Sequence, residues 1–152
     1  MKRLFLILSI FVFLSALCFA PKAFKNDKLT NASSTNKTPK MAIIIDDFGS
    51  YDQSGVETLS KCTEKLTCAV IPNVDNSKNN AKQFAELGHE IILHMPMEAY
   101  VRFPESWYGP VYIKNTDSPE TATKKLENCL KEFDGIKGFN IHIGSGVSQN
   151  QT

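Results

Sequence analysis

Apolar runs alternate with helix-like segments along most of the chain, and this alternation most constrains the fold. Four runs have the length and residue types of β-strands: residues 42–45, 66–71, 90–93 and 138–143. Helical spacing of apolar side chains marks the segments between them: residues 50–61, 77–87 and 118–133. Because strands that alternate with helices form parallel sheets through right-handed crossovers, the chain is predicted to be an α/β protein with flanking helices.

The run MAIIIDD, residues 41–47, is predicted to contain the first strand of this sheet. Its aliphatic residues are continuous instead of alternating with polar ones, which is typical of a parallel strand buried on both faces. Asp46 and Asp47 follow directly. Ligands of parallel βα folds bind at the carboxyl ends of the strands, so these two carboxylates are expected at the lip of a functional site.

Histidines occupy the corresponding ends of two further strands. His94 follows the third run, and His142 lies near the end of the fourth. Carboxylate oxygens and imidazole nitrogens together suit a divalent metal that keeps open positions for water and substrate. The alternatives are structural, because paired Asp residues also form turns and a histidine at a strand end often only packs. His89, at the start of the third strand, is assigned such a structural role.

The N-terminus has the pattern of an export signal. A short basic head is followed by a mostly apolar run over residues 4–20, so residues 1–20 are predicted to be a secretory signal peptide. The run is also at the lower limit for crossing a bilayer, ~17 residues, so a membrane anchor is the alternative. The protein is therefore expected to be exported, and periplasmic, extracellular or membrane-anchored at the cell envelope.

A polar segment separates this signal from the folded part. Residues 21–40 are rich in Asn, Ser, Thr and Lys and have no apolar period, so they are predicted to be a flexible linker. The folded domain is expected to span residues 41–152. With 17 basic and 16 acidic side chains, the chain has no charge excess that would favour a nucleic-acid partner.

Four sequence blocks, in this order, resemble the successive motifs of the divergent polysaccharide deacetylase family, a branch of the carbohydrate deacetylase superfamily: IIIDDFG, LTCAVIPN, GHEIILHMPME and GFNIHIGS. The resemblance covers nearly all of residues 41–145. It implies a distorted (β/α) barrel, of which this chain holds about four βα units. It also implies a divalent metal centre, of the Zn²⁺ type, and hydrolysis of an N- or O-acetyl group on a polysaccharide.

The same resemblance implies roles for individual residues. Asp46 matches the catalytic base, Asp47 the first metal ligand, and His94 the first histidine of the metal motif. The second histidine of that motif would fall where this chain has Glu98. Either Glu98 or His142 completes the ligand set, and His142 is preferred because its strand tip faces the same rim.

Aromatic residues in the long loop after the third strand are candidates for binding the substrate. Trp107 and Tyr108 lie in this loop, between several prolines. Their rings either stack on sugar rings or cover the end of the barrel. Both interpretations fit the sequence.

The family pattern implies a longer domain than the one seen here. A (β/α)₈ barrel typically has ~200 residues or more, whereas this sequence reaches a polar tail directly after the fourth strand motif. We expect a truncated barrel with an unprotected strand edge, weak stability and little activity. A catalytically inactive remnant, or a glycan-binding fragment of the same fold, is the alternative function. The sequence does not specify an oligomeric state.

Overall fold

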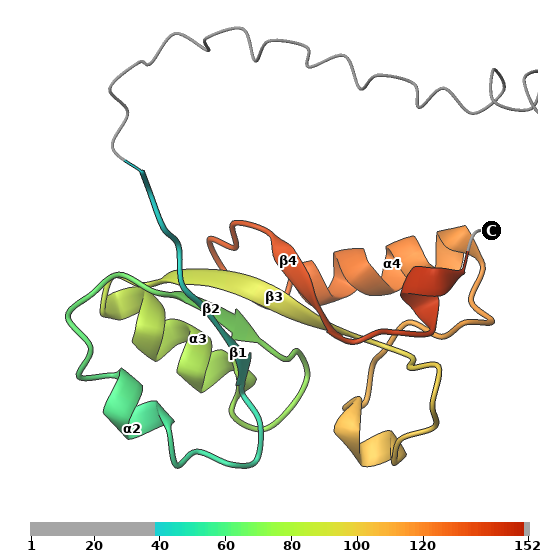
Figure 1. The fold of residues 1–152 in the computed structure, drawn as a ribbon, viewed down its shortest axis with the longest axis horizontal. Helices are drawn as coiled ribbons and strands as arrows, with labels where there is room; N and C mark the ends of the chain where they lie inside the picture. The colour runs from blue at the N-terminus through green and yellow to red at the C-terminus, as the bar shows by residue number, and fades with distance from the viewer. Residues whose placement is uncertain (1–38, 151–152) are drawn as a thin grey trace, which may run out of the picture. The chain divides into compact units, whose positions relative to one another are not determined.

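The structure, a computed structural model, describes residues 39–150 (Figure 1). The predicted signal peptide or anchor, and residues 21–38 of the predicted linker, lie outside the described residues. Within residues 39–150 no helix combines the length and the hydropathy needed to cross a membrane.

Four parallel strands form one curled sheet with the order β1-β2-β3-β4. Their bounds are Ile44–Phe48 for β1, Thr67–Val70 for β2, Glu90–Met97 for β3 and Phe139–Ile143 for β4. Each strand follows its neighbour in sequence, so every connection is a crossover of the βαβ kind. The predicted α/β class, a partial (β/α) barrel with parallel strands, is confirmed.

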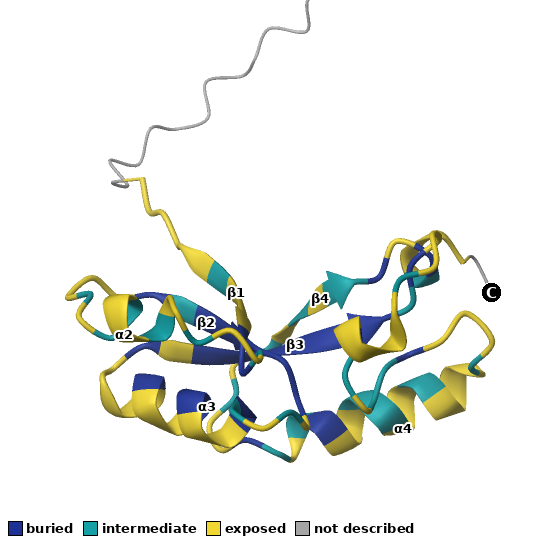
Figure 2. Cartoon of the chain, turned by 90° about the horizontal axis from the view of Figure 1, so that it is seen from below, coloured by how far each residue is buried: buried dark blue, intermediate teal, exposed yellow. Residues whose placement is uncertain are grey.

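Helices cover one side of this sheet. The α-helices are α2 (Val56–Leu59), α3 (Ser77–Glu86) and α4 (Pro119–Leu130), and single 3₁₀ turns are formed by η1 (Glu105–Trp107) and η2 (Val147–Gln149). Figure 2 shows α3 and α4 beneath the sheet, while β1 and β4 rise on either side of β2 and β3. The face away from these helices is therefore the concave one.

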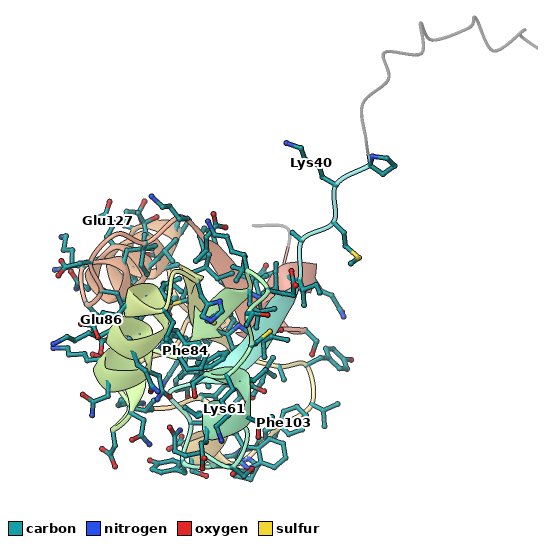
Figure 3. The ribbon with its side chains drawn as sticks, turned by 90° about the vertical axis from the view of Figure 1, so that its left-hand side faces the viewer. Lys40, Lys61, Phe84, Glu86, Phe103 and Glu127 are labelled. Atoms are coloured by element: carbon teal, nitrogen blue, oxygen red, sulfur yellow. The ribbon has the colours of Figure 1, made fainter. Side chains whose placement is uncertain are left out.

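The hydrophobic core lies between the helices and alternate side chains of the two central strands. Val70, Leu93 and Met95 are fully buried there with Phe84 of α3. Figure 3 shows Phe84 directed inward, whereas charged side chains such as Glu86 lie at the periphery. Because successive strand side chains point to opposite faces, the residues between these core positions face the concave side.

Local signals place the start of α4 and the end of α3 close to where the sequence predicts them, whereas α4 ends at Leu130, before the predicted residue 133. Ser118 caps α4 by accepting a hydrogen bond from the Thr121 N–H, and Pro119 takes the first turn, where its missing N–H costs nothing. Gly88 follows α3 with a φ of +87°, a left-handed conformation that glycine adopts without strain. These signals fix where α4 begins and where α3 ends before β3.

The expectation that the first strand is buried on both faces is wrong. Ile43 is 44% exposed and Ile44 is 50% exposed. The reason is position, because β1 is an edge strand with a single neighbour, β2. β4 forms the other edge and also keeps half-exposed apolar side chains, Phe139 and Ile141.

The helix predicted over residues 50–61 is much shorter, since α2 covers only Val56–Leu59. Side chains before it bind the local backbone instead. The Asp52 carboxylate accepts the Ser54 N–H at 2.9 Å, and the Gln53 amide donates to the Ser50 carbonyl. Such bonds offer the backbone an alternative to the helix, so this stretch forms a turn.

The third strand is longer than predicted and does not end at His94. β3 continues to Met97, because β4 pairs with it as far as the Met97–Ile143 pair. Ile113 adds an isolated bridge to Met97. His94 therefore lies within a strand with neighbours on both sides, which explains why the residue is only 3% exposed.

Candidate metal centre

A β-bulge at the end of β1 turns both adjacent carboxylates toward the same region. Ile45 pairs with Cys68 and Phe48 with Val70, so β1 uses one residue more than β2 between these pairs. Asp47 has a φ of +67°, a left-handed conformation that Asp tolerates better than most residues. In a regular strand Asp46 and Asp47 would point to opposite faces, and the bulge removes that separation.

The residues after the bulge anchor it to the core. Phe48 is buried, with its ring centroid 4.7 Å from that of Phe84. Gly49 has a φ of +88° and donates its N–H to the buried Asn80 side chain at 2.9 Å. A Cβ at Gly49 would lie 3.1 Å from the Ile71 carbonyl oxygen, so the DDFG sequence suits this tight turn.

The side chains of Asp47, His94 and His142 converge at the end of the curled sheet. Asp47 Oδ1 lies 3.2 Å from His94 Nε2 and 2.9 Å from His142 Nδ1. The two facing imidazole nitrogens are 3.1 Å apart. The structure thus brings together the three residues predicted to bind metal, although no metal ion is part of the structure.

The outer nitrogen of each imidazole faces an oxygen that accepts hydrogen bonds. His94 Nδ1 lies 2.6 Å from Asn140 Oδ1, and His142 Nε2 lies 3.0 Å from the Trp107 carbonyl oxygen. Since neither oxygen can donate, each outer nitrogen must carry the proton. In the neutral rings this leaves lone pairs on His94 Nε2 and His142 Nδ1, the two nitrogens that face Asp47.

Three electron-pair donors therefore face one another, a carboxylate oxygen and two imidazole nitrogens, with separations of 2.9 to 3.2 Å. Such a set repels itself unless a metal ion lies among its members or one of the inner nitrogens takes up a proton. Metal–ligand bonds of about 2.0–2.2 Å put neighbouring ligand atoms about 3 Å apart. Two histidines and one carboxylate, with outer nitrogens held by oxygens, are also a frequent metal-binding set. The residues present fit a divalent metal.

Asp46 belongs to the same network through Asn140. Asn140 Nδ2 donates to Asp46 Oδ1 at 2.7 Å, while Asn140 Oδ1 faces His94. The sequence interpretation did not include Asn140. A signal was present, because Asn140 and His142 are two residues apart on one strand and so share a face.

Glu98, the alternative metal ligand, lies outside this cluster. Its carboxylate accepts the Asn115 N–H at 2.7 Å and so holds the turn that follows the long loop. The geometry therefore favours His142 over Glu98 as the third member of the set.

The two aromatic residues predicted to bind substrate are placed differently. Trp107 is 58% exposed, and its ring stacks on Phe103 with centroids 5.2 Å apart. Tyr108 is buried, its ring stacks on Tyr112, and its hydroxyl accepts the Ala99 N–H. Tyr108 packs the loop against the fold, so only Trp107 offers a ring face to a ligand.

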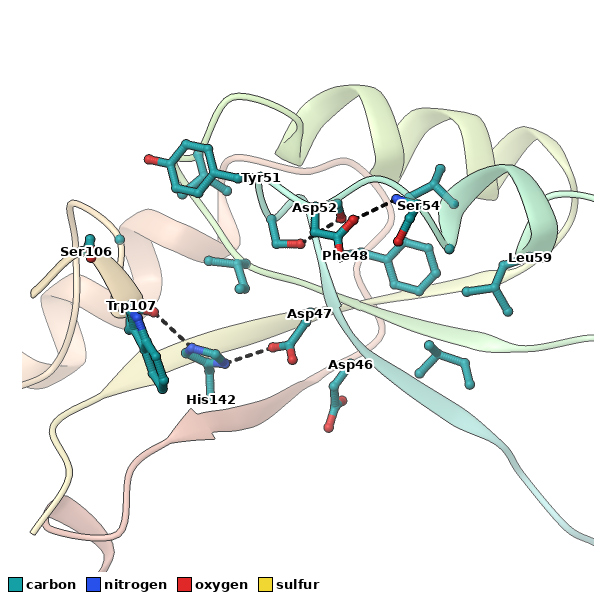
Figure 4. Close-up of a pocket in the computed structure, with 17 residues that line it drawn as sticks. Asp46, Asp47, Phe48, Tyr51, Asp52, Ser54, Leu59, Ser106, Trp107 and His142 are labelled. Carbon is teal, nitrogen blue, oxygen red and sulfur yellow. Dashed lines mark hydrogen bonds and ion pairs between the residues drawn. The ribbon is translucent and has the colours of Figure 1, made fainter. Parts of the chain in front are cut away.

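A pocket of about 470 Å³ opens beside Asp47 and His142 (Figure 4). Its rim carries Trp107 from η1 and Tyr51 from the loop after β1, and Tyr51 is 75% exposed. Asp46 and Asp47 lie on its wall. The candidate metal centre is therefore open to solvent on the side where these aromatic rings stand.

The parallel, curled βα sheet places the chain in the class of (β/α)-barrel proteins, and two imidazoles and a carboxylate at one rim form a candidate metal centre. Residues 43–152 match the model of a family described as divergent polysaccharide deacetylase. The chain belongs to this family.

Two similar proteins extend this comparison. The uncharacterized protein YibQ of Escherichia coli K12 is 28% identical over 115 residues, which cover 73% of this chain and 34% of YibQ. The crystal structure of the uncharacterized protein ATU2773 from Agrobacterium tumefaciens C58 superposes with a TM-score of 0.58 and 17% identity, over 68% of this chain and 42% of that one. The latter similarity supports the fold alone. The chain spans less than half the length of either protein.

Proposed function

We propose that this protein functions as a metal-dependent hydrolase that removes acetyl groups from a polysaccharide. The convergence of three metal-competent atoms carries the proposal: Asp47 Oδ1, His94 Nε2 and His142 Nδ1 lie within 3.2 Å of one another. The outer nitrogens of the two histidines already face oxygens that accept hydrogen bonds, so the lone pairs of their inner nitrogens point toward Asp47. Membership of the divergent polysaccharide deacetylase family supports the choice of reaction.

Asp47, His94 and His142 would hold the metal, which we propose to be Zn²⁺ because the donor set joins nitrogen and oxygen. A divalent cation bound there supplies Lewis acidity toward an acyl carbonyl oxygen. The protein groups fix its position, since His94 is held by Asn140 and His142 by the Trp107 carbonyl.

Asp46 is the proposed general base. Asn140 holds one of its carboxylate oxygens, Oδ1, and within residues 39–150 the other oxygen makes no hydrogen bond. The side chain is 51% exposed, so water reaches it. A carboxylate held at one oxygen and open at the other can accept a proton from a water that attacks an acetyl carbon.

A purified full chain tests the proposal through metal content and acetate release. Incubation with Zn²⁺ followed by desalting should leave one Zn²⁺ per chain, and Asp47→Ala and His94→Ala should each abolish it. Asp46→Asn should keep the metal but reduce acetate release from an N-acetylated oligosaccharide by about 10²–10⁴-fold. An O-acetylated oligosaccharide assayed in parallel identifies the bond that is cleaved. A wild-type chain that retains no Zn²⁺ would contradict the proposal.

Glycan binding without hydrolysis is the second candidate function, and the exposed ring of Trp107 favours it. An aromatic face beside an open pocket can bind a sugar whether or not a reaction follows. Titration with a non-hydrolysable oligosaccharide separates the two candidates. If the zinc-loaded chain binds this oligosaccharide but releases no acetate from an acetylated one, glycan binding without hydrolysis is favoured.

We also propose that the protein acts outside the cytoplasm. The apolar segment at residues 4–20, preceded by a basic head, supports this proposal. Fractionation of cells that produce the full chain, followed by mass spectrometry of its N-terminus, distinguishes a cleaved signal peptide from a retained anchor. Recovery of the intact chain in the cytoplasm would contradict the proposal that the protein acts outside it.

A further inference from the structure

The side-chain amide of Asn140 links two groups with different proposed duties. Its Oδ1 lies 2.6 Å from Nδ1 of His94, a proposed metal ligand. Its Nδ2 donates to Oδ1 of Asp46, the proposed base, at 2.7 Å. One planar amide thus contacts both the metal set and the base.

The orientation of this amide follows from the chemistry of its neighbours. Rotation by 180° would place Oδ1 against the Asp46 carboxylate, and two acceptors repel each other. In the orientation present, the amide donates to Asp46 and accepts from His94. His94 must then carry its proton on Nδ1, so its Nε2 lone pair points toward Asp47 and His142.

The position of Asn140 on the sheet makes this link rigid. Asn140 pairs with His94 across β3 and β4, so the two side chains leave neighbouring strands on the same face. Asp46 approaches from β1, the far edge of the curled sheet. Within the described part of the chain, no other side chain donates a hydrogen bond at ordinary length to Asp46; His94 Nδ1 is 3.9 Å away.

We infer that Asn140 is a positioning residue that fixes the tautomer of His94 and the place of Asp46 at the same time. The inference rests on the proposed function and deepens it. The two effects are separable, since the tautomer of His94 depends on Asn140 Oδ1 and the place of Asp46 depends on Asn140 Nδ2. Substitutions that keep one atom and change the other should therefore affect metal affinity and turnover differently.

Asn140→Asp preserves the shape and keeps an oxygen that accepts the His94 Nδ1–H. Its second oxygen faces Asp46, and the two like charges repel. Zn²⁺ affinity should stay within about threefold of wild type, because a carboxylate partner supports a ligating histidine well. Acetate release should fall about 10²-fold, since a base displaced by about 1 Å costs that much.

Asn140→Leu has a similar volume and forms neither hydrogen bond. His94 loses the partner that selects its tautomer, so Zn²⁺ affinity should fall about 10–100-fold. Acetate release at saturating Zn²⁺ should also fall. Asn128→Leu on the exposed face of α4 is the matched control and should change neither quantity.

Three measurements on the full chain test the inference: Zn²⁺ affinity by competition with a chelator, acetate release, and long-range ¹H–¹⁵N NMR of the metal-free imidazoles. In wild type and Asn140→Asp, NMR should show the proton of His94 on Nδ1. In Asn140→Leu it should show a mixture of tautomers. The His142 tautomer, held by the Trp107 carbonyl, should be the same in all variants.

The outcomes separate this inference from the proposed function. If the wild type binds no Zn²⁺, the proposed function fails. The comparison of the His94 tautomer in wild type and Asn140→Leu by NMR then still shows whether Asn140 fixes that tautomer. If the wild type binds Zn²⁺ while Asn140→Leu retains both its affinity and the His94 tautomer, the inference is overturned. Equal losses of metal affinity in Asn140→Asp and Asn140→Leu would also overturn it, because the two effects would then be inseparable.

Discussion

His142 Nδ1 lies 2.9 Å from Asp47 Oδ1, although β4 and β1 are the opposite edges of the sheet. The curl of the sheet brings these edges together at the candidate metal centre. A cation that binds both residues would therefore tie the first strand to the last. Metal binding is expected to stabilise the fold as well as to complete the site.

Zn²⁺ should raise the melting temperature of the protein. A ligand that binds only the native state adds about 2.7 kcal/mol at 100 times its Kd, which corresponds to roughly 10 °C for a domain of this size. Thermal unfolding followed by circular dichroism, with Zn²⁺ or with a chelator, measures the shift. His142→Ala should abolish it, whereas Asp134→Ala, outside the cluster, should not. The same shift in both variants would contradict binding at this site.

The backbone at Asp47 should tolerate Asn better than a β-branched residue. Its φ of +67° is accessible to Asn and Asp but strained for Val, by roughly 1–2 kcal/mol. In a chelator, Asp47→Asn should change the free energy of unfolding by less than about 0.5 kcal/mol, while Asp47→Val should lower it by that strain. Urea unfolding measures both, and Glu90→Val, at an exposed strand position with negative φ, is the control. Equal effects at positions 47 and 90 would contradict the strain at the bulge.

Much of the candidate site follows from general rules of parallel sheets. Parallel strands put their carboxyl ends at one edge, which is why the sequence alone is enough to group Asp47, His94 and His142. The bulge could not be predicted, because the period of a regular strand assigns Asp46 and Asp47 to opposite faces. The role of Asn140 was missed for a related reason, since it requires the curl that carries Asp46 from β1 toward β4.

Burial was the least predictable property. An Ile-rich run looks the same in an edge strand and in a central strand, so the exposure of β1 depends on sheet order, which the sequence does not state. The helix expected at residue 50 is shortened by hydrogen bonds from Asp52 and Gln53, and these depend on individual side-chain geometry. Tyr108 and Trp107 are adjacent, yet only the fold decides which ring is buried.

The exposure of β1 predicts unequal costs for two similar substitutions. Ile91 is 4% exposed in the core on β3, and Ile44 is 50% exposed on β1. Ile91→Ala should lower the free energy of unfolding by about 2–5 kcal/mol, because it leaves a cavity. Ile44→Ala should cost less than about 1 kcal/mol. Urea unfolding of both variants tests this, and a large cost at Ile44 would show that β1 is covered in solution.

Asp117 should contribute stability that is lost in acid. Burial raises the pKa of its carboxyl, but the Lys114 N–H and the Lys125 ammonium outweigh this effect and leave the pKa below its ordinary value of 3.8. Because the folded pKa is the lower one, the contribution is complete above the unfolded pKa and is lost as pH falls through the folded pKa. Asp117→Asn should destabilise the protein near neutral pH, by about 1–3 kcal/mol, and by less as the pH falls below about 4. Asp134→Asn, at an exposed turn, is the matched control and should change the free energy of unfolding near neutral pH by less than about 0.5 kcal/mol.

Trp107 should serve the site in two separable ways. Its carbonyl accepts a hydrogen bond from His142, while its ring lies exposed at the rim of the pocket. Trp107→Ala removes the ring and leaves the carbonyl, so Zn²⁺ affinity should stay within about threefold of wild type. Affinity for an oligosaccharide should fall about tenfold or more, the cost of losing one aromatic contact worth about 1.4 kcal/mol.

Calorimetric titration of the zinc-loaded chain with an N-acetylated oligosaccharide measures this loss, and Tyr51→Ala tests a second exposed aromatic ring that lines the same pocket. Tyr108→Phe is the matched control for an aromatic residue that does not face the pocket, because it removes only the hydroxyl that holds Ala99. Unchanged oligosaccharide affinity in Trp107→Ala would assign the exposed ring to packing on Phe103 and remove Trp107 from the proposed glycan site.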